Sequence, residues 1–157
     1  MKLQDDTLKA FGLKLGLPEL KFDAVRTCQL KIEGLKLALY DNRARKSMTI
    51  LCELSDESVD RAHVETWHKF LLTSQFDFLQ RESAVVGINP ASGAMVAMSH
   101  IADEALSLSQ LSAALNDLID WVLACYERFS TSTRQRFAST SCLTHQYSHS
   151  LSRSQHA

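Results

Sequence analysis

The segment from Ser83 to Phe129 places the strongest constraint on how this chain folds. It holds two short apolar runs, residues 84–88 and 94–98, on either side of Asn-Pro-Ala-Ser-Gly at residues 89–93. Because Pro and Gly favour a turn, the two runs are predicted to form a β-hairpin. The residues that follow carry apolar side chains at alternating spacings of three and four, which is one stripe of a helix. The stripe consists of Leu108, Leu111, Leu115, Leu118, Val122, Cys125 and Phe129. This order predicts a helix packed across a sheet.

The residues before this segment predict one helix, three strands and a second helix. Residues 3–16 show helical apolar spacing, and the Gly and Pro that follow are typical of a helix end. Residues 28–33, 35–40 and 48–54 alternate apolar and polar side chains, as half-exposed antiparallel strands do. A second helix, with an acidic N-cap, is predicted over residues 60–74. We therefore expect an α+β fold of order α-β-β-β-α-β-β-α, in which an antiparallel twisted sheet packs against helices.

Two apolar surfaces are larger than the core of one small sheet requires. Leu13 and Leu17 lie off the main stripe of the first helix, where they either widen its buried face or leave an apolar strip for a partner. Val64, Trp67 and Leu71 lie on one side of the second helix, which is either buried within one chain or a seam between two copies. The sequence leaves both pairs of alternatives open.

Length and charge indicate one soluble domain followed by a tail of different character. The chain has 157 residues, and its apolar runs are shorter than the roughly 20 residues that a membrane helix needs. Residues 1–129 hold 14 Lys and Arg against 18 Asp and Glu, a net charge of −4 that argues against nucleic acid. Residues 130–157 hold three Arg and no acid, and 12 of these 28 residues are Ser or Thr. We expect a domain of residues 1–129 and a flexible Ser/Thr-rich tail of residues 130–157.

No combination of residues predicts catalysis, a cofactor or a metal. The four cysteines are widely spaced without a CxxC pair, as expected of a reduced, cytoplasmic protein with no signal peptide. Cys52 with His63 or His68 would supply a nucleophile and a base, but Cys52 belongs to the apolar face of its strand, where a thiol stays protonated. The Cys-x2-His-x3-His spacing of residues 142–149 lacks a fourth ligand, and the glycines form no phosphate loop. We expect no enzyme activity, no cofactor and no metal.

The order and spacing of the predicted elements resemble those of the class I type III secretion chaperones, the Tir-chaperone family. The resemblance rests on Gly16-Leu17-Pro18-Glu19-Leu20, the strand Cys28–Glu33, Phe70-Leu71-Leu72, and Val86-Gly87-Ile88 with Gly93-Ala94-Met95-Val96-Ala97-Met98, followed by Ile101 through Leu106 into Leu111, Leu115 and Trp121. It covers about residues 3–129. The chain departs from the family at Ser74-Gln75, where Asn is usual, and the resemblance says nothing of its long tail.

The resemblance implies a cytoplasmic bacterial homodimer that binds the N-terminal region of a secreted effector. The effector would be held in extended form and kept soluble and competent for secretion. Effector contacts would fall on Leu13, Leu17, Leu30, Ile32, Met95 and Met98, and dimer contacts on Val64, Trp67, Leu71, Val86 and Ile88. The ATPase of the secretion apparatus would be a further partner, and neither nucleic acid nor membrane is expected to bind.

A small α+β ligand-binding or sensor-type domain without catalytic activity is the alternative. Such a domain would need a closed apolar pocket with a few convergent polar groups. A chaperone of extended segments would instead present apolar patches and an open sheet edge on its outer surface. The two hypotheses therefore differ in where the apolar surface lies.

Overall fold

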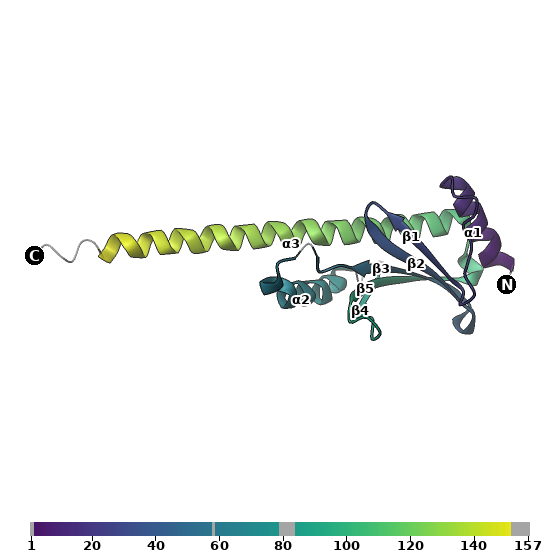
Figure 1. Ribbon diagram of the computed structural model, residues 1–157, viewed down its shortest axis with the longest axis horizontal. Helices are drawn as coiled ribbons and strands as arrows, with labels where there is room; N and C mark the ends of the chain where they lie inside the picture. Colours follow the sequence, from purple (N-terminus) through teal and green to yellow (C-terminus); the bar gives the residue numbers. More distant parts are fainter. Residues whose placement is uncertain (1, 58, 79–83, 152–157) are drawn as a thin grey trace, which may run out of the picture. The chain divides into compact units, whose positions relative to one another are not determined.

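Figure 1 shows the computed structural model of the chain, which describes residues 2–57, 59–78 and 84–151. The chain divides into two compact units, residues 1–123 and residues 124–157. Ser83 and the predicted-tail residues 152–157 lie outside the described residues.

The first unit has the α+β order that the sequence predicts. Its helices are α1 (Lys2–Lys14), α2 (Val64–Ser74) and the first part of α3 (Leu108–Leu151). Its strands are β1 (Thr27–Ile32), β2 (Leu35–Asn42), β3 (Ser47–Leu54), β4 (Val85–Ile88) and β5 (Met95–Ala102). Short 3-10 turns lie at η1 (Arg43–Arg45), η2 (Arg61–His63), η3 (Gln75–Phe78) and η4 (Asp103–Ala105). The fold class is therefore confirmed.

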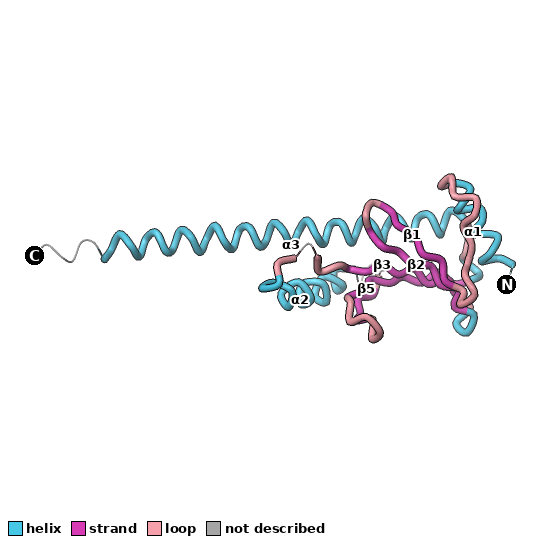
Figure 2. Tube along the Cα trace, viewed as in Figure 1, coloured by secondary structure: helices cyan, strands magenta, loops and turns pink. Residues whose placement is uncertain are grey.

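The described strands form one antiparallel sheet in the order β1-β2-β3-β5-β4 (Figure 1). Figure 2 shows these strands in magenta. The first three strands make a meander, and β4 with β5 makes the predicted hairpin. It is β5 that joins the hairpin to β3, so β1 and β4 become the two edges. β5 is longer than the predicted run of residues 94–98, because Ser99, His100 and Ile101 continue the ladder with β3.

The cross-strand register brings the apolar residues onto one face of the sheet. Cys28, Leu39, Ile50 and Ser99 form one row across this face, and Leu30, Leu37, Cys52, Ala97 and Val86 form the next. The first part of α3 covers it with the predicted stripe, of which Leu111, Leu115, Leu118 and Val122 are buried. Each buried leucine contributes roughly 1.5–3 kcal/mol of transfer free energy. The helix packed across the sheet is therefore confirmed.

An arginine cluster joins α1 to the start of β1 and the end of β2. The Arg26 guanidinium donates a hydrogen bond of 2.8 Å to Asp5 on α1 and another of 2.8 Å to Asp41 on β2. It also lies 4.6 Å from the centroid of the Phe22 ring, a cation–π distance. The Asp41 side chain is only 1% exposed, so the arginine supplies the positive charge that this buried carboxylate requires. The hydrogen bonds to Asp5 and Asp41 raise the pKa of Arg26.

In the second unit, α3 continues helically to Leu151. The sequence predicts a flexible tail from residue 130, whereas the structure is helical from there to Leu151. No Gly or Pro follows Gly93 in the sequence, so nothing local stops the helix. The Thr131 and Thr133 hydroxyls also donate to carbonyls four residues earlier, at 3.0 and 2.9 Å, which satisfies them within the helix. The division of the chain at residue 130 stays a prediction.

Candidate functional site

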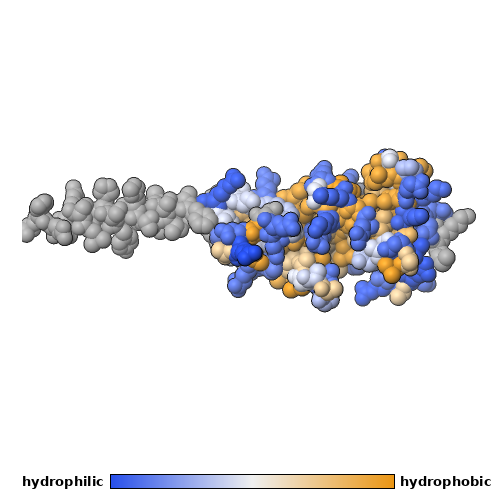
Figure 3. Space-filling model, in the orientation of Figure 1, coloured by the Kyte–Doolittle hydropathy of each residue, from blue (hydrophilic) through white to orange (hydrophobic). Residues whose placement is uncertain are grey.

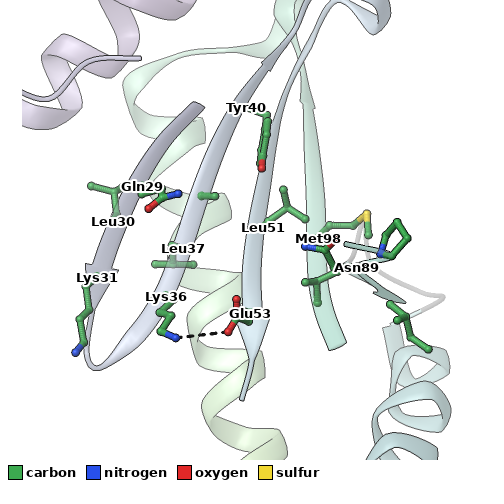
Figure 4. Close-up of a pocket in the computed structure, with 14 residues that line it drawn as sticks. Gln29, Leu30, Lys31, Lys36, Leu37, Tyr40, Leu51, Glu53, Asn89 and Met98 are labelled. Carbon is green, nitrogen blue, oxygen red and sulfur yellow. Dashed lines mark ion pairs between the residues drawn. The ribbon is translucent and has the colours of Figure 1, made fainter. Parts of the chain in front are cut away.

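The face of the sheet opposite α3 has no helix of the described part of the first unit laid across it. Figure 4 looks onto this open face, with α3 passing behind the strands. A hollow of about 730 Å³ lies on it. Its lining includes Gln29, Lys31, Lys36, Ala38, Tyr40, Leu51, Glu53, Val96 and Met98. The hollow is therefore a mixed polar and apolar outer surface, which differs from the closed apolar pocket that the ligand-binding alternative requires.

The β1 edge exposes backbone groups that are free to pair with another strand. The Asp41 N–H donates to the Arg26 carbonyl at 3.1 Å, which fixes the alternation of bonded pairs between β1 and β2. Because bonded positions alternate in an antiparallel ladder, Gln29 and Lys31 direct their N–H and C=O groups away from β2. Within the described residues no hydrogen bond reaches these groups. The outward groups of Thr27 are instead satisfied by Asp23, at 2.8 Å each.

An apolar strip lies at the C-terminal end of α1 and in the turn after it. We define the α1 strip as Leu13, Leu15 and Leu17, whose exposed fractions are 60%, 43% and 47%. Apolar surface is visible over the end of α1 in Figure 3. The turn folds tightly onto the helix at Gly12, where an added Cβ would lie 2.5 Å from the Leu17 carbonyl oxygen. A glycine inside the helix is therefore what allows Leu17 to lie there.

A second exposed apolar set surrounds the β4 edge. We define the α2–β4 group as Leu72, Phe76, Val85 and Ile88, which are 40%, 63%, 52% and 60% exposed. The backbone of this edge is partly occupied, because the Val86 N–H donates to the Gln75 side-chain oxygen at 3.1 Å. Gln75 belongs to the Ser74-Gln75 pair, where the family resemblance leads one to expect Asn. The β4 edge therefore exposes mainly apolar side chains, and less of its backbone is free to pair with another strand.

The proposed effector contacts fall in three environments. Leu13 and Leu17 are exposed, and Leu30 and Ile32 are half-buried on the β1 edge strand. Met98 is half-buried and lines the open face. Met95 is fully buried in the core, so its side chain has no surface to offer an effector. The family resemblance led us to expect both methionines among the effector contacts, but residues three apart in a strand point to opposite faces, and we withdraw Met95 on that ground.

The proposed dimer contacts also divide by burial. Ile88 is 60% exposed and Val64 is half-buried, so both have surface available to a second copy. Trp67 and Leu71 are 0% exposed, and Val86 is 6% exposed. The sequence left open whether the second helix is buried within one chain or lies between two copies. For Trp67 and Leu71, burial within one chain is the alternative that holds. Both side chains are therefore part of the core of one chain and have no surface to offer a second copy.

The contacts expected from the sequence did not include Gly12, Leu72, Phe76 or Val85. An isolated glycine within helical spacing is a recognised sign of close backbone approach, and Gly12 could have been found that way. The exposure of the other three depends on which neighbours cover them, and periodicity does not contain that information.

The thiol and imidazole groups do not form a reactive pair in the described part of the chain. Cys52 is fully buried, and desolvation with the nearby Glu53 charge raises the pKa of its thiol to about 12. His68 instead pairs with Asp56 at 3.1 Å. His100 forms an ordinary hydrogen bond, with 2.8 Å between its Nδ1 and the Thr49 hydroxyl oxygen.

Two general properties hold for the described residues. Among them, no group of three or more His, Cys, Asp or Glu could hold a metal ion. None of their helices is long and apolar enough to cross a membrane. The side chains of Cys142, His145 and His149 lie outside those that the structure describes.

Comparisons with known proteins agree with this architecture. Residues 6–123 match the sequence profile of the Tir chaperone protein (CesT) family. The HopA1–SchA chaperone–effector complex contains a chain of similar fold, with a TM-score of 0.67 and 23% identity over 80% of this chain and 94% of that chain. The ExsC–ExsE complex gives a TM-score of 0.62 and 18% identity, covering 75% and 86%. The ExoT–SpcS complex from Pseudomonas aeruginosa gives 0.55 and 15%, covering 78% and 96%. No protein with a curated description is significantly similar in sequence.

The helix-covered sheet with two exposed edges defines a small α+β protein-binding domain. The chain belongs to the Tir chaperone protein (CesT) family, whose match spans nearly the whole first unit. It is a type III secretion chaperone.

Proposed function

We propose that this chaperone binds the N-terminal region of a secreted effector in extended form and keeps it soluble and competent for secretion. The effector segment adds as a strand to the β1 edge and places apolar side chains on the α1 strip. The solved complexes of similar fold, among them one of a chaperone with the effector HopA1, support this assignment.

The observation that carries the proposal is the unoccupied backbone of β1. Gln29 and Lys31 turn their N–H and C=O groups outward, and strand addition satisfies such groups while alternate side chains give specificity. The half-buried Leu30 and Ile32 would contact every second residue of the added strand. The exposed leucines of the α1 strip add apolar surface for a segment that continues beyond β1.

A second copy of the chain is the proposed occupant of the α2–β4 group. An exposed apolar set of this kind around an uncharged edge is typical of a surface that a partner covers permanently. Val64 and Ile88 remain from the dimer contacts expected from the sequence, and Leu72, Phe76 and Val85 join them.

The cellular location of the chaperone and its later partner are also part of what we propose. The protein acts in the bacterial cytoplasm without catalysing a reaction, which agrees with the high pKa of the Cys52 thiol. The ATPase of the secretion apparatus is a proposed later partner of the loaded chaperone.

Strand addition can be tested by removing one outward N–H. Gln29→Pro removes the N–H that faces away from β2 and leaves the bonds between β1 and β2 in place, because edge strands tolerate proline. The tagged full chain is purified from its native bacterium, bound proteins are identified by mass spectrometry, and limited proteolysis maps the protected segment. Wild type is expected to retain a secreted protein protected near its N-terminus, and Gln29→Pro to lose it at an unchanged melting temperature.

Gln29→Ala is the matched control, because it shortens the same side chain and keeps the N–H. It is expected to retain the effector. Equal recovery of the protected segment by wild type and by a folded Gln29→Pro protein would contradict strand addition at β1.

A further inference from the structure

Two lysines face each other at the β1 edge on the open face of the sheet. Lys31 on β1 lies directly opposite Lys36 on β2. The pair belongs to the positions that are not hydrogen-bonded, where opposed Cα atoms are only about 4.5 Å apart. Like charges placed opposite each other in this way destabilise a strand pair. The edge is therefore locally basic on a domain whose net charge is −4, from 14 Lys and Arg and 18 Asp and Glu in residues 1–129.

Only one of these two charges is compensated within the described residues. The Lys36 ammonium lies 3.6 Å from a Glu53 carboxylate oxygen on β3. Lys31 has no carboxylate of the described residues within ion-pair distance, and neither does it pair with Glu33 in the turn that follows. Figure 4 shows Lys36 directed toward Glu53, with Lys31 extending alone at the outer edge. The row Lys31–Lys36–Glu53 thus ends on an unpaired positive charge at the edge where a new strand would add.

We infer that the effector segment added to β1 carries Asp or Glu opposite Lys31, between two apolar residues. This inference rests on the proposed strand addition. Residues of the new strand opposite Leu30 and Ile32 lie on the helix-covered side, where an apolar side chain extends the core. The residue between them lies on the open face beside Lys31, where a carboxylate supplies the missing opposite charge. Lys31 is a specificity-determining residue for an apolar–acidic–apolar segment.

Charge complementarity distinguishes this occupant from parts of the chain itself. A second β1 strand would oppose Lys31 with residues of Thr27–Ile32, none of which is acidic. The β4 strand Val85–Ile88 also has no acid. Residues 130–157 hold three arginines and no acid, so they too lack a counter-charge for Lys31. A segment from another protein is the occupant that fits.

The test selects peptides with the full-length chain and one charge-reversed variant. A random peptide library displayed on phage is selected separately against wild type, Lys31→Glu and Arg45→Glu. Arg45 is exposed in η1, at the other end of β2, so Arg45→Glu makes the same change of net charge away from the edge. Wild type and Arg45→Glu are expected to enrich apolar–acidic–apolar segments, and Lys31→Glu to enrich a basic residue at the central position.

Synthetic peptides measure the size of the preference. For an enriched peptide, changing the central Glu to Gln is expected to weaken binding to wild type about two- to fivefold, from the usual worth of a cross-strand charge pair. The same change is expected to have no effect on binding to Lys31→Ala, and the difference should shrink in high salt.

The possible outcomes distinguish the preference for an acid opposite Lys31 from strand addition itself. Alternating apolar peptides that are enriched without a central acid, or with an acid that Lys31→Glu does not alter, would overturn the inference and leave strand addition standing. A selection in which no variant enriches an alternating segment would overturn both.

Discussion

The two edges of the sheet are built for different kinds of contact. β1 has six residues, an outward backbone at Gln29 and Lys31 that the described chain leaves unbonded, and an uncompensated lysine. β4 has four residues and no charge, and Gln75 occupies its Val86 N–H. Its exposed groups are apolar side chains, Val85 and Ile88. One edge offers backbone with a charge beside it, and the other offers apolar surface.

This difference indicates how one small sheet avoids pairing with itself. A charge on an exposed edge discourages indiscriminate strand pairing. The backbone of β1 therefore stays open, while Lys31 limits which strands can pair with it. An uncharged apolar edge has no such protection and requires a permanent cover, which a second copy supplies in our proposal. The β1 edge is thus suited to exchangeable partners and the β4 edge to a constant one.

The largest effect is expected from a charge at the β4 edge. Ile88→Asp would place an uncompensated carboxylate in the proposed interface, where an unpaired buried charge costs about 3 kcal/mol or more, so the dimer should dissociate to monomers. Light scattering coupled to gel filtration measures the mass. Val25→Asp, at a residue that is 77% exposed, is the control and should remain dimeric. A dimer that survives Ile88→Asp unchanged would remove β4 from the interface.

A large effect on the β1 side is expected from Gly12→Ala. The new Cβ would lie 2.5 Å from the Leu17 carbonyl oxygen and 2.7 Å from Leu20 Cβ, so the turn that carries the α1 strip must move. Overpacking of this kind costs about 1–3 kcal/mol of unfolding free energy, to be measured by urea denaturation. Gly87→Ala on β4 is the control, since its Cβ meets only Met98 Cε at 3.5 Å, and it should change stability by less than about 0.5 kcal/mol. Equal stability of the two variants would contradict the tight turn.

Local patterns in the sequence predict most of the fold. The alternation of residues 28–33 and 35–40 predicts both strands and their faces, because a period of two leaves no choice of side. The stripe from Leu108 predicts the covering helix for the same kind of reason. The continuation of that helix beyond Phe129 was not predicted, since Ser and Thr are poor helix formers but are not helix stops.

The binding surfaces are less predictable because they depend on what remains uncovered. Trp67 and Ile88 are both large and apolar, yet one is fully buried and the other 60% exposed. Only the packing of α2 and the position of β4 at the edge decide between them. Lys31 is predictable only in part. The alternation of β1 places Lys31 on the open face, but its lack of an ion pair depends on which carboxylates lie across the sheet.

A moderate effect is expected from Gln75→Ala at the β4 edge. This change leaves the Val86 N–H, which is part-buried, without its 3.1 Å acceptor, and an unsatisfied buried donor costs about 1–3 kcal/mol. Thermal unfolding should show a lower midpoint for Gln75→Ala, and Gln29→Ala at the β1 edge should show none of this loss. If the two glutamine variants unfold at the same temperature, the β4 backbone is not held by Gln75, and the contrast between the edges weakens.

The smallest effect is expected from Lys36→Ala, which separates the charge of β1 from that of β2. The Lys36–Glu53 pair is 3.6 Å apart, and its side chains are 69% and 41% exposed, so its loss should change stability by less than about 0.5 kcal/mol. Removing Lys36 also removes the like charge opposite Lys31, which offsets part of that loss. Urea denaturation in low and high salt measures both terms, and the small difference from wild type should vanish in high salt. A loss above 1 kcal/mol would contradict this expectation, because Lys36 would then stabilise the sheet by more than an exposed ion pair does.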